Sequence, residues 1–283
     1  MAKTYIPGES KEQRKARKRQ EKDGRNNADN SISVSTSRAS NPISIPTNKQ
    51  VESNVIACLK WGNKYSAKYV NNLYNMVKRN CTVDYEFVCF TEDSKDINSE
   101  ITIQPLPVSP VTGWWFKPYM LSNKIPYKGT LLFLDLDVIV FKNIDKLFAW
   151  EPNQFLICKD FNRSLRSNWD RMNSSVFRTP IGKYEHLYDE FIRNVNFHTS
   201  KNRGDQDWMY REIKDHKFFP DEWAMSYKWE MRDRRDLTMD ANRKRNFSLD
   251  APPIINNQTC IAVFHGDPNP EHANDSWVKQ HWG

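Results

Sequence analysis

Ten consecutive residues, 131–140, set two carboxylates into an otherwise unbroken apolar run. Four apolar residues precede Asp135 and three follow Asp137, which is typical of a central strand that is covered on both faces. An unpaired carboxylate costs several kcal/mol in such surroundings. Residues i and i+2 of a strand point to the same side, so both acids can offer oxygens to one divalent cation. The stretch therefore predicts a buried strand that ends in a cation site.

The Asp-x-Asp spacing by itself is weak evidence. Chance gives about one or two such matches in a chain with 21 aspartates, and this chain has a second match at Asp205 and Asp207. The hydrophobic strand around Asp135 and Asp137 distinguishes the first match from the second. On this stretch alone, the alternative is a strand end whose acids face water or cap the next turn.

The composition of the 283 residues is that of a globular protein with an aromatic-rich core. No apolar run approaches the roughly 18 residues of a membrane span, and the amino terminus lacks the apolar segment of a signal peptide. We therefore expect a cytoplasmic protein. The five cysteines are odd in number, scattered and without a Cys-x-x-Cys pair, which predicts reduced thiols in the core.

The positive charge is concentrated in the first 52 residues. This segment holds 11 of the 42 Lys and Arg and 6 of the 35 Asp and Glu, which leaves 31 cations against 29 acids in the remainder. Its basic and Ser/Asn-rich composition predicts a disordered tail, residues 1–52, in front of a domain at 53–283. Such a tail suits an anionic membrane surface or an acidic partner. We expect no specific nucleic-acid binding, because the folded part offers no second basic stripe.

The order of predicted elements indicates an α/β fold. A strand at 54–59, an amphipathic helix at 66–79 with Ser66 as its cap, and a strand at 85–91 open the domain. Further strands are predicted at 101–106, 155–158, 171–177 and 260–264, and further helices at 113–121, 183–196 and from residue 204. Residues 232–244 are predicted to form an exposed basic loop. Ligands of open α/β sheets bind beyond the carboxyl ends of strands, where Asp135 and Asp137 fall.

Seven motifs occur in an order that is fairly specific as a set. They are Tyr65, Lys117, Asp135-Leu136-Asp137, Asn143-Ile144-Asp145-Lys146-Leu147-Phe148, Asn173-Ser174-Ser175, Gly204-Asp205-Gln206 and His265-Gly266. In this order the chain resembles the metal-dependent nucleotide-sugar glycosyltransferases of the GT-A fold, in particular family 8 with glycogenin and bacterial galactosyltransferases. The resemblance covers residues 53–283. It implies a Rossmann-like mixed sheet flanked by helices.

The resemblance also implies a function and a metal site. The expected activity is the transfer of a hexose from a UDP-sugar to a glycan, lipid or protein acceptor, with retention at the anomeric carbon. The implied ion is Mn²⁺, with Mg²⁺ as the alternative, held by Asp135, Asp137, His265 and the donor diphosphate. Two carboxylates with one imidazole suit Mn²⁺ better than an all-oxygen site would. The ion would stabilise the negative charge on departing UDP.

The remaining roles follow from the same resemblance. Tyr65 is expected to stack on uracil, its alternative role being to cover the first helix. Asp205 and Gln206 are the expected catalytic residues, placed beside the anomeric carbon, and the alternative is an acidic helix start. The other expected donor contacts are made by Lys117, Asp135, Asn173, Ser174 and Gly266.

One departure from the family pattern concerns the diphosphate. The family places a lysine after the late histidine, whereas this chain has Asn269 there. The phosphate charge is then left to the metal and another cation. Two other readings stay open: a haloacid dehalogenase-like phosphohydrolase, with Asp135 as nucleophile, and a non-catalytic nucleotide-sugar binding module.

Overall fold

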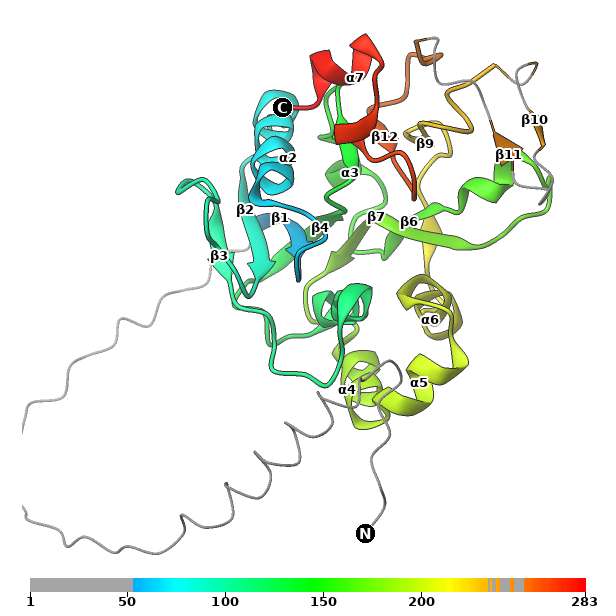
Figure 1. The fold of residues 1–283 in the computed structure, drawn as a ribbon. Coiled ribbons are helices and arrows are strands. Elements are labelled where there is room, and N and C mark those ends of the chain that lie inside the picture. Colours follow the sequence, from blue (N-terminus) through cyan, green and yellow to red (C-terminus); the bar gives the residue numbers. More distant parts are fainter. Residues whose placement is uncertain (1–52, 234, 236–237, 240–244, 247–251) are drawn as a thin grey trace, which may run out of the picture. The chain divides into compact units, whose positions relative to one another are not determined.

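The computed structural model describes residues 53–233, 235, 238–239, 245–246 and 252–283, so the predicted disordered tail, residues 1–52, lies outside the described residues. A seven-stranded sheet has the strand order β3-β2-β1-β4-β7-β6-β8, and a three-stranded sheet has the order β5-β12-β9 (Figure 1). The strands are β1 Ser53–Lys60, β2 Tyr85–Thr91, β3 Thr102–Gln104, β4 Gly129–Leu134, β5 Val138–Val140, β6 Leu156–Lys159, β7 Met172–Pro180, β8 Lys217–Phe218, β9 Ala224–Ser226, β10 Thr238–Met239, β11 Arg245–Asn246 and β12 Ile261–Val263.

The helices connect these strands in the manner of an α/β fold. They are α2 Ala67–Asn80, α3 Lys146–Ala149, α4 Glu185–Arg193, α5 Val195–Lys201, α6 Asp205–Glu212 and α7 Ser276–His281, with 3-10 helices η1 Gly113–Leu121, η2 Phe161–Ser164 and η4 Pro270–His272. Strands β3, β2, β1 and β4 run parallel, and β7 runs antiparallel to β4 and β6. This mixed sheet with flanking helices confirms the predicted fold class. Among the residues that the structure describes, no helix combines the length and apolar composition needed to cross a membrane.

The central strands are apolar throughout because they face two cores. In β4, Leu132 and Leu134 belong to one core, while Leu131 and Phe133 belong to the other. Helices α2 and α7 contribute to the first core and lie on one side of the large sheet, whereas η1, α4 and α6 contribute to the second (Figure 1). All five cysteines are buried and unpaired, as predicted.

The predicted single strand over 131–140 is wrong. Strand β4 ends at Leu134, and β5 begins at Val138 in the other sheet. The amide of Asp135 donates to the carbonyl of Ser175 at 2.8 Å, and the carbonyl of Asp137 accepts from the amide of Phe264 at 3.0 Å. The segment thus crosses from the large sheet to the small one. An apolar run on both sides of the crossing gives no sign of it in the sequence.

Four further expectations need correction or refinement. The predicted helix 183–196 is two helices, α4 and α5, which meet at Asn194. The predicted helix 113–121 is a 3-10 helix with Pro118 inside, a residue that has no N–H to donate. Ser66 occupies the N-cap position of α2, but its side chain makes no capping hydrogen bond. The predicted exposed loop at 232–244 lies mostly outside the described residues (234, 236–237 and 240–244). In its described part Arg232 is buried, with its guanidinium 4.1 Å from the centroid of the Tyr227 ring.

The Asn-Ile-Asp motif joins α3 to the turn that follows α2. Asp145 accepts hydrogen bonds from the Thr82 amide at 2.8 Å and from Asn143 Nδ2 at 3.0 Å, and it also contacts the Thr82 hydroxyl. Burial by itself would raise the pKa of Asp145, but these hydrogen bonds lower it to about 2. The carboxylate therefore stabilises the turn in its charged form.

We predict that Asp145→Asn lowers the free energy of unfolding by about 1 kcal/mol at pH 7, a value discounted for solvent screening. A folded-state pKa below the ordinary value contributes stability above about pH 4, and this contribution is lost as the pH falls towards 2. The difference between parent and variant should therefore shrink with acidification. Urea denaturation at pH 7 and pH 3 measures it, with Asp84→Asn, an exposed acid of the same turn, as control. A difference that is the same at both pH values would contradict the assignment.

Candidate active site

A cavity of about 740 Å³ opens at one end of the central strands of the large sheet. The carboxyl ends of β1 and β4, the amino end of β7 and the start of α6 meet there, as expected for ligand sites of open α/β sheets. Nine of the ten predicted site residues line this cavity: Tyr65, Lys117, Asp135, Asp137, Asn173, Ser174, Asp205, Gln206 and His265. Gly266 is not among its lining residues.

His265 reaches the two aspartates through strand pairing. Strand β12 pairs antiparallel with β5, with Val263 opposite Val138, so the chain after β12 runs beside the residues before β5. His265 therefore lies next to the crossing that holds Asp135 and Asp137, although about 130 residues separate them in the chain. The family resemblance predicts that these three residues lie close together. The pairing of β5 with β12 is the structural cause.

A buried lysine compensates part of the negative charge. Lys117 Nζ lies 2.8 Å from Asp135 Oδ1 and 3.9 Å from Asp205 Oδ2, and it donates to the Ser174 hydroxyl at 3.1 Å. Burial alone would lower the pKa of Lys117, but Asp135 and Asp205 outweigh it and the net shift is upward. Lys117 is thus a buried, charged group inside the site.

Asp137 is the least compensated of the carboxylates. Its Oδ2 accepts a hydrogen bond of 2.9 Å from the Tyr65 hydroxyl. Burial, followed by repulsion from Asp135, raises the pKa of Asp137 to about 7, against the opposing effects of Tyr65 and Lys117. Burial and Asp137 likewise raise the pKa of Tyr65, which keeps this phenol protonated. The Tyr65 ring also packs on Tyr69 at a centroid distance of 4.7 Å, so both the hydroxyl and the ring of Tyr65 are held in place.

Asp205 begins α6 and faces the same cavity. Its side chain is buried, and within the described part of the chain its Oδ2 has no hydrogen-bond partner. Burial raises the pKa of Asp205, while Lys117 acts in the opposite direction. Gln206 follows on the first turn of the helix. An acceptor oxygen that is buried but unsatisfied is the kind of group that a ligand hydroxyl can satisfy.

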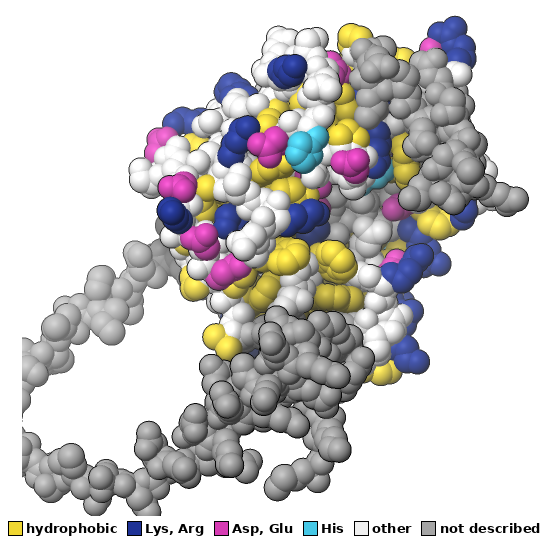
Figure 2. All heavy atoms as spheres, in the orientation of Figure 1, with side chains coloured by type: hydrophobic (Ala, Val, Ile, Leu, Met, Phe, Trp, Pro, Cys, Tyr) yellow, Lys and Arg dark blue, Asp and Glu magenta, His cyan; other side chains and the backbone are white. Residues whose placement is uncertain are grey.

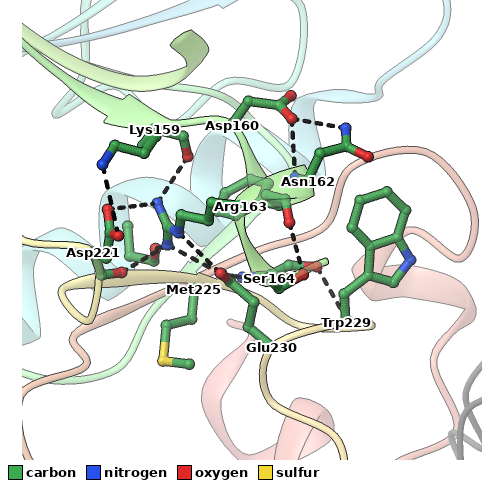
Figure 3. A network of polar contacts seen from close by, with 12 residues as sticks. Lys159, Asp160, Asn162, Arg163, Ser164, Asp221, Met225, Trp229 and Glu230 are labelled. Carbon is green, nitrogen blue, oxygen red and sulfur yellow. Dashed lines mark hydrogen bonds and ion pairs between the residues drawn. The ribbon is translucent and has the colours of Figure 1, made fainter. Parts of the chain in front are cut away.

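A network of polar side chains fixes the position of His265. The Nε2 atom of His265 shares a hydrogen bond of 2.6 Å with the Ser226 hydroxyl, and the Ser226 amide donates to Glu230 Oε2 at 2.9 Å. Arg163 in turn binds Glu230 through Nε at 2.9 Å, and Figure 3 shows its guanidinium between Glu230 and Asp221. Burial, with a contribution from the charge of Lys228, lowers the pKa of His265 to about 3. The imidazole is therefore neutral, as a metal ligand must be.

The chemical types of the three candidate ligands suit a divalent cation, but their side chains are not grouped closely enough to coordinate one. Among the described residues, no three His, Cys, Asp or Glu side chains lie close enough together to hold a metal ion. Ser226 engages His265, and Lys117 engages Asp135. Three carboxylates surround the buried ammonium of Lys117, and burial together with repulsion from Asp135 raises the pKa of Asp137. A cation beside Asp137 would relieve that excess.

The structure also reveals a cation that the sequence did not single out. Lys228 Nζ donates to the carbonyl of Asp267 at 2.8 Å, and a Cβ on Gly266 would lie 3.4 Å from the same nitrogen. Gly266 has a φ of +76°, so the chain turns sharply here beneath Lys228. The charge of Lys228 acts on both Asp137 and His265. Lys228 is therefore a cation beside Gly266 and Asp267, close in the chain to His265.

Aromatic and basic residues complete the rim of the cavity. The lining residues that the sequence reasoning missed include Trp61, Trp114, Arg166, Trp169, Arg171 and Arg203. A partial signal existed for two of them, since Trp61 directly follows the first predicted strand and Trp114 opens the segment that carries Lys117. The others lie in loops whose patterns indicate only exposure.

We predict that Lys117→Met lowers the free energy of unfolding by about 3 kcal/mol at pH 7, because it leaves buried carboxylates without their cation. Burial already raises the pKa of Asp137 and Asp205, so these groups take up protons readily once Lys117 is absent. The loss should consequently be smaller at pH 5.

Urea denaturation at both pH values measures this loss. The control is Lys124→Met, which removes an exposed pair with Asp189 and should change stability by less than about 1 kcal/mol. Equal stabilities of the Lys117 and Lys124 variants would contradict the compensating role of Lys117.

Comparison with known proteins identifies the fold. No protein-family model and no curated protein matches the sequence. Among solved structures, the galactosyltransferase LgtC in complex with donor and acceptor sugar analogs matches with a TM-score of 0.51 and 13% identity, over 80% of this chain and 93% of LgtC. The bifunctional glycosyltransferase WbbM matches with a TM-score of 0.53 and 13% identity, over 86% of this chain and 52% of WbbM. The apo form of GlyE from Streptococcus pneumoniae TIGR4 matches with a TM-score of 0.51 and 12% identity, over 78% of this chain and 56% of GlyE. The chain therefore has the fold of the GT-A glycosyltransferases.

Proposed function

We propose that this protein is a metal-dependent glycosyltransferase that moves a hexose from a UDP-sugar to a glycan, lipid or protein acceptor, with retention at the anomeric carbon. The observation that carries the proposal is the assembly of Asp135, Asp137 and His265 with Asp205 and Gln206 around one cavity. The shared fold with enzymes described as glycosyltransferases, one of them a galactosyltransferase, supports the reaction class.

Asp135, Asp137 and His265 would hold the ion, together with oxygens of the donor diphosphate. Two carboxylates and one neutral imidazole favour Mn²⁺, with Mg²⁺ as the weaker alternative. When bound, the ion supplies the positive charge that offsets the charge developing on the leaving diphosphate. Ser226 would fix the orientation of the His265 ring, as hydrogen-bond partners of ligating histidines commonly do.

Lys228 would supply the second cation for the diphosphate. It lies beside Gly266 and Asp267, near the proposed ligand His265, and its charge acts on Asp137. An ammonium in this place can bind phosphate oxygens as a point charge. Gly266 would contribute to donor binding by leaving room for the Lys228 side chain and for the phosphates.

The opposite wall would bind and position the sugar. The Oδ2 atom of Asp205 is buried without a hydrogen-bond partner among the described residues, and it would accept a hydrogen bond from a sugar hydroxyl. With Gln206 it would stabilise positive charge near the anomeric carbon in the transition state. Asn173 and Ser174 would bind hexose hydroxyls, and Lys117 would hold Asp135 and Ser174 in place. Tyr65 would offer its ring to uracil while its hydroxyl orients Asp137.

Metal-dependent binding of UDP tests the donor site. We predict that UDP binds in the presence of Mn²⁺ and not after chelation, and that Asp137→Ala weakens this binding by more than about tenfold, because a ligand of the ion is lost. Isothermal titration measures it. Metal-independent binding, or no binding of UDP at all, would falsify the proposal.

Turnover separates transfer from the two other readings. Asp205→Asn should still bind UDP but lose turnover of a UDP-hexose by about a hundredfold, since Asp205 acts on the sugar and not on the nucleotide. If the parent binds UDP but neither hydrolyses nor transfers from UDP-sugars, it is a binding module. Release of phosphate from a generic phosphoester, abolished in Asp135→Asn, would instead identify a phosphohydrolase.

The role of Lys228 has its own test. We predict that Lys228→Gln weakens UDP binding by about tenfold and leaves uridine binding unchanged, because only the diphosphate meets the ammonium. Lys124→Gln, a lysine paired with Asp189 outside the cavity, serves as the matched control and should affect neither ligand. A parallel loss of uridine affinity would show that the Lys228 substitution disturbs the fold instead.

A further inference from the structure

A second cavity, of about 410 Å³, has a strongly basic lining and is called here the basic pocket. Its charged lining residues are five cations and one acid: Arg171, Lys201, Arg203, Arg211, Lys214 and Asp207. They come from the residue that precedes β7, the end of α5, and α6 with its flanking residues. These segments are brought together by the fold, because Arg171 is 30 residues from Lys201 in the chain.

The cations of the basic pocket are mostly uncompensated. The single acid, Asp207, already binds Arg203, with Nε of Arg203 2.8 Å from Oδ2 of Asp207. Within the described part of the chain, Lys201, Arg211 and Lys214 form no ion pair, and all three are exposed. The pocket therefore carries a local excess of positive charge that no neighbouring side chain balances.

Several exposed lysines elsewhere on the described surface are paired with acids, such as Lys68 with Glu271 at 3.2 Å and Lys78 with Glu100 at 3.1 Å. Figure 2 shows Lys/Arg and Asp/Glu side chains interspersed over much of the visible face, while dark blue side chains dominate the lower right edge, the side on which Figure 1 draws α5 and α6. The basic pocket thus brings several cations together in one concave place, although the folded part as a whole is nearly neutral.

The basic pocket adjoins the proposed active site. Arg171, Arg203 and Asp207 line both cavities, so the two are neighbours with a shared wall. Helix α6 presents Asp205 to the larger cavity and Arg211 to the basic pocket, about 9 Å apart along the helix axis. One acceptor molecule can therefore reach both.

The proposed binding site for the donor diphosphate is formed by other elements than the basic pocket. Asp137, His265 and Lys228 belong to the crossing segment and to the chain around β9 and β12, whereas the basic pocket is built from β7, α5 and α6. The donor therefore leaves the basic pocket to the other substrate.

We propose that the basic pocket binds a phosphate group carried by the acceptor saccharide, so that the enzyme glycosylates a phosphorylated glycan. This inference rests on the proposed glycosyltransferase function. A phosphate monoester is close to dianionic near neutral pH and offers three acceptor oxygens, which matches several cations that surround one space. Arg171 and Arg211 add planar guanidinium groups that can bind two phosphate oxygens at once.

Binding of glucose 6-phosphate in the presence of UDP and Mn²⁺ tests the pocket, with glucose and glucuronic acid as the comparison ligands. The variant carries Lys201→Gln, Arg211→Gln and Lys214→Gln, three exposed residues that line only the basic pocket. We expect about a tenfold loss of affinity for glucose 6-phosphate, from the sum of three exposed charge contributions, and no change for glucose. The control variant carries Lys95→Gln, Lys124→Gln and Arg193→Gln, exposed cations elsewhere, and should bind glucose 6-phosphate like the parent.

Several outcomes would overturn the proposal. Equal affinity of the two triple variants for glucose 6-phosphate would show that the pocket does not bind the phosphate. Tighter binding of glucuronic acid, lost in the pocket variant, would make it a carboxylate site. Binding of phosphatidylglycerol vesicles that is lost in the pocket variant, without any binding of glucose 6-phosphate, would make the surface a membrane contact.

Hydrolysis of the UDP-sugar donor separates this inference from the function on which it rests. It should be unchanged in the pocket variant, because these three residues lie outside the donor cavity. If the parent does not bind UDP while glucose 6-phosphate still depends on the basic pocket, the glycosyltransferase function fails and the anion site stands. If UDP binding and donor hydrolysis are intact but glucose 6-phosphate does not bind, the inference fails alone.

Discussion

Partial burial of two carboxylates where the chain passes from one sheet to the other is the constraint on which the rest of the site depends. Asp135 is tied to β7 through its amide, and Asp137 is tied to the chain after β12 through its carbonyl. Both side chains are thereby held beside an apolar core, where the charged form of a carboxyl group is costly. Lys117 offsets part of this cost from η1. The backbone crossing thus fixes the acids, and the acids require a cation near them.

The surroundings divide the two cavities into regions of opposite charge. Near the crossing, three carboxylates share one buried ammonium, and the neutral His265 adds no charge of its own. In the basic pocket, arginines and lysines dominate the lining. A cation is therefore attracted to the crossing and an anion to the end of α6. The same short helix contributes Asp205 to one region and Arg211 to the other, which links the proposed donor and acceptor sites.

Local sequence pattern was enough for most of the elements that position the site. Strands β1 and β2 and helix α2 are where the apolar periodicity places them, because each buries its pattern in a core that forms on both faces of the sheet. The apolar pattern did not predict the break within 131–140, because β4 and β5 are equally apolar although they belong to different sheets. It also failed at Asn194, where α4 ends and α5 begins. In both cases the decisive event is a change of direction that apolar spacing does not encode.

The sequence by itself determined the α/β class, the two aspartates at a strand end and nine of the ten candidate site residues that line the cavity, because apolar periodicity and the order of motifs can be read directly along the chain. Only the tertiary structure decided that Lys228 stands by Gly266, that Ser226 holds His265, and that Arg171 joins the cations of α5 and α6. These contacts join segments that are far apart in the chain. Their geometry depends on how β12 pairs with β5 and how α6 packs on β7, and no local pattern carries that information.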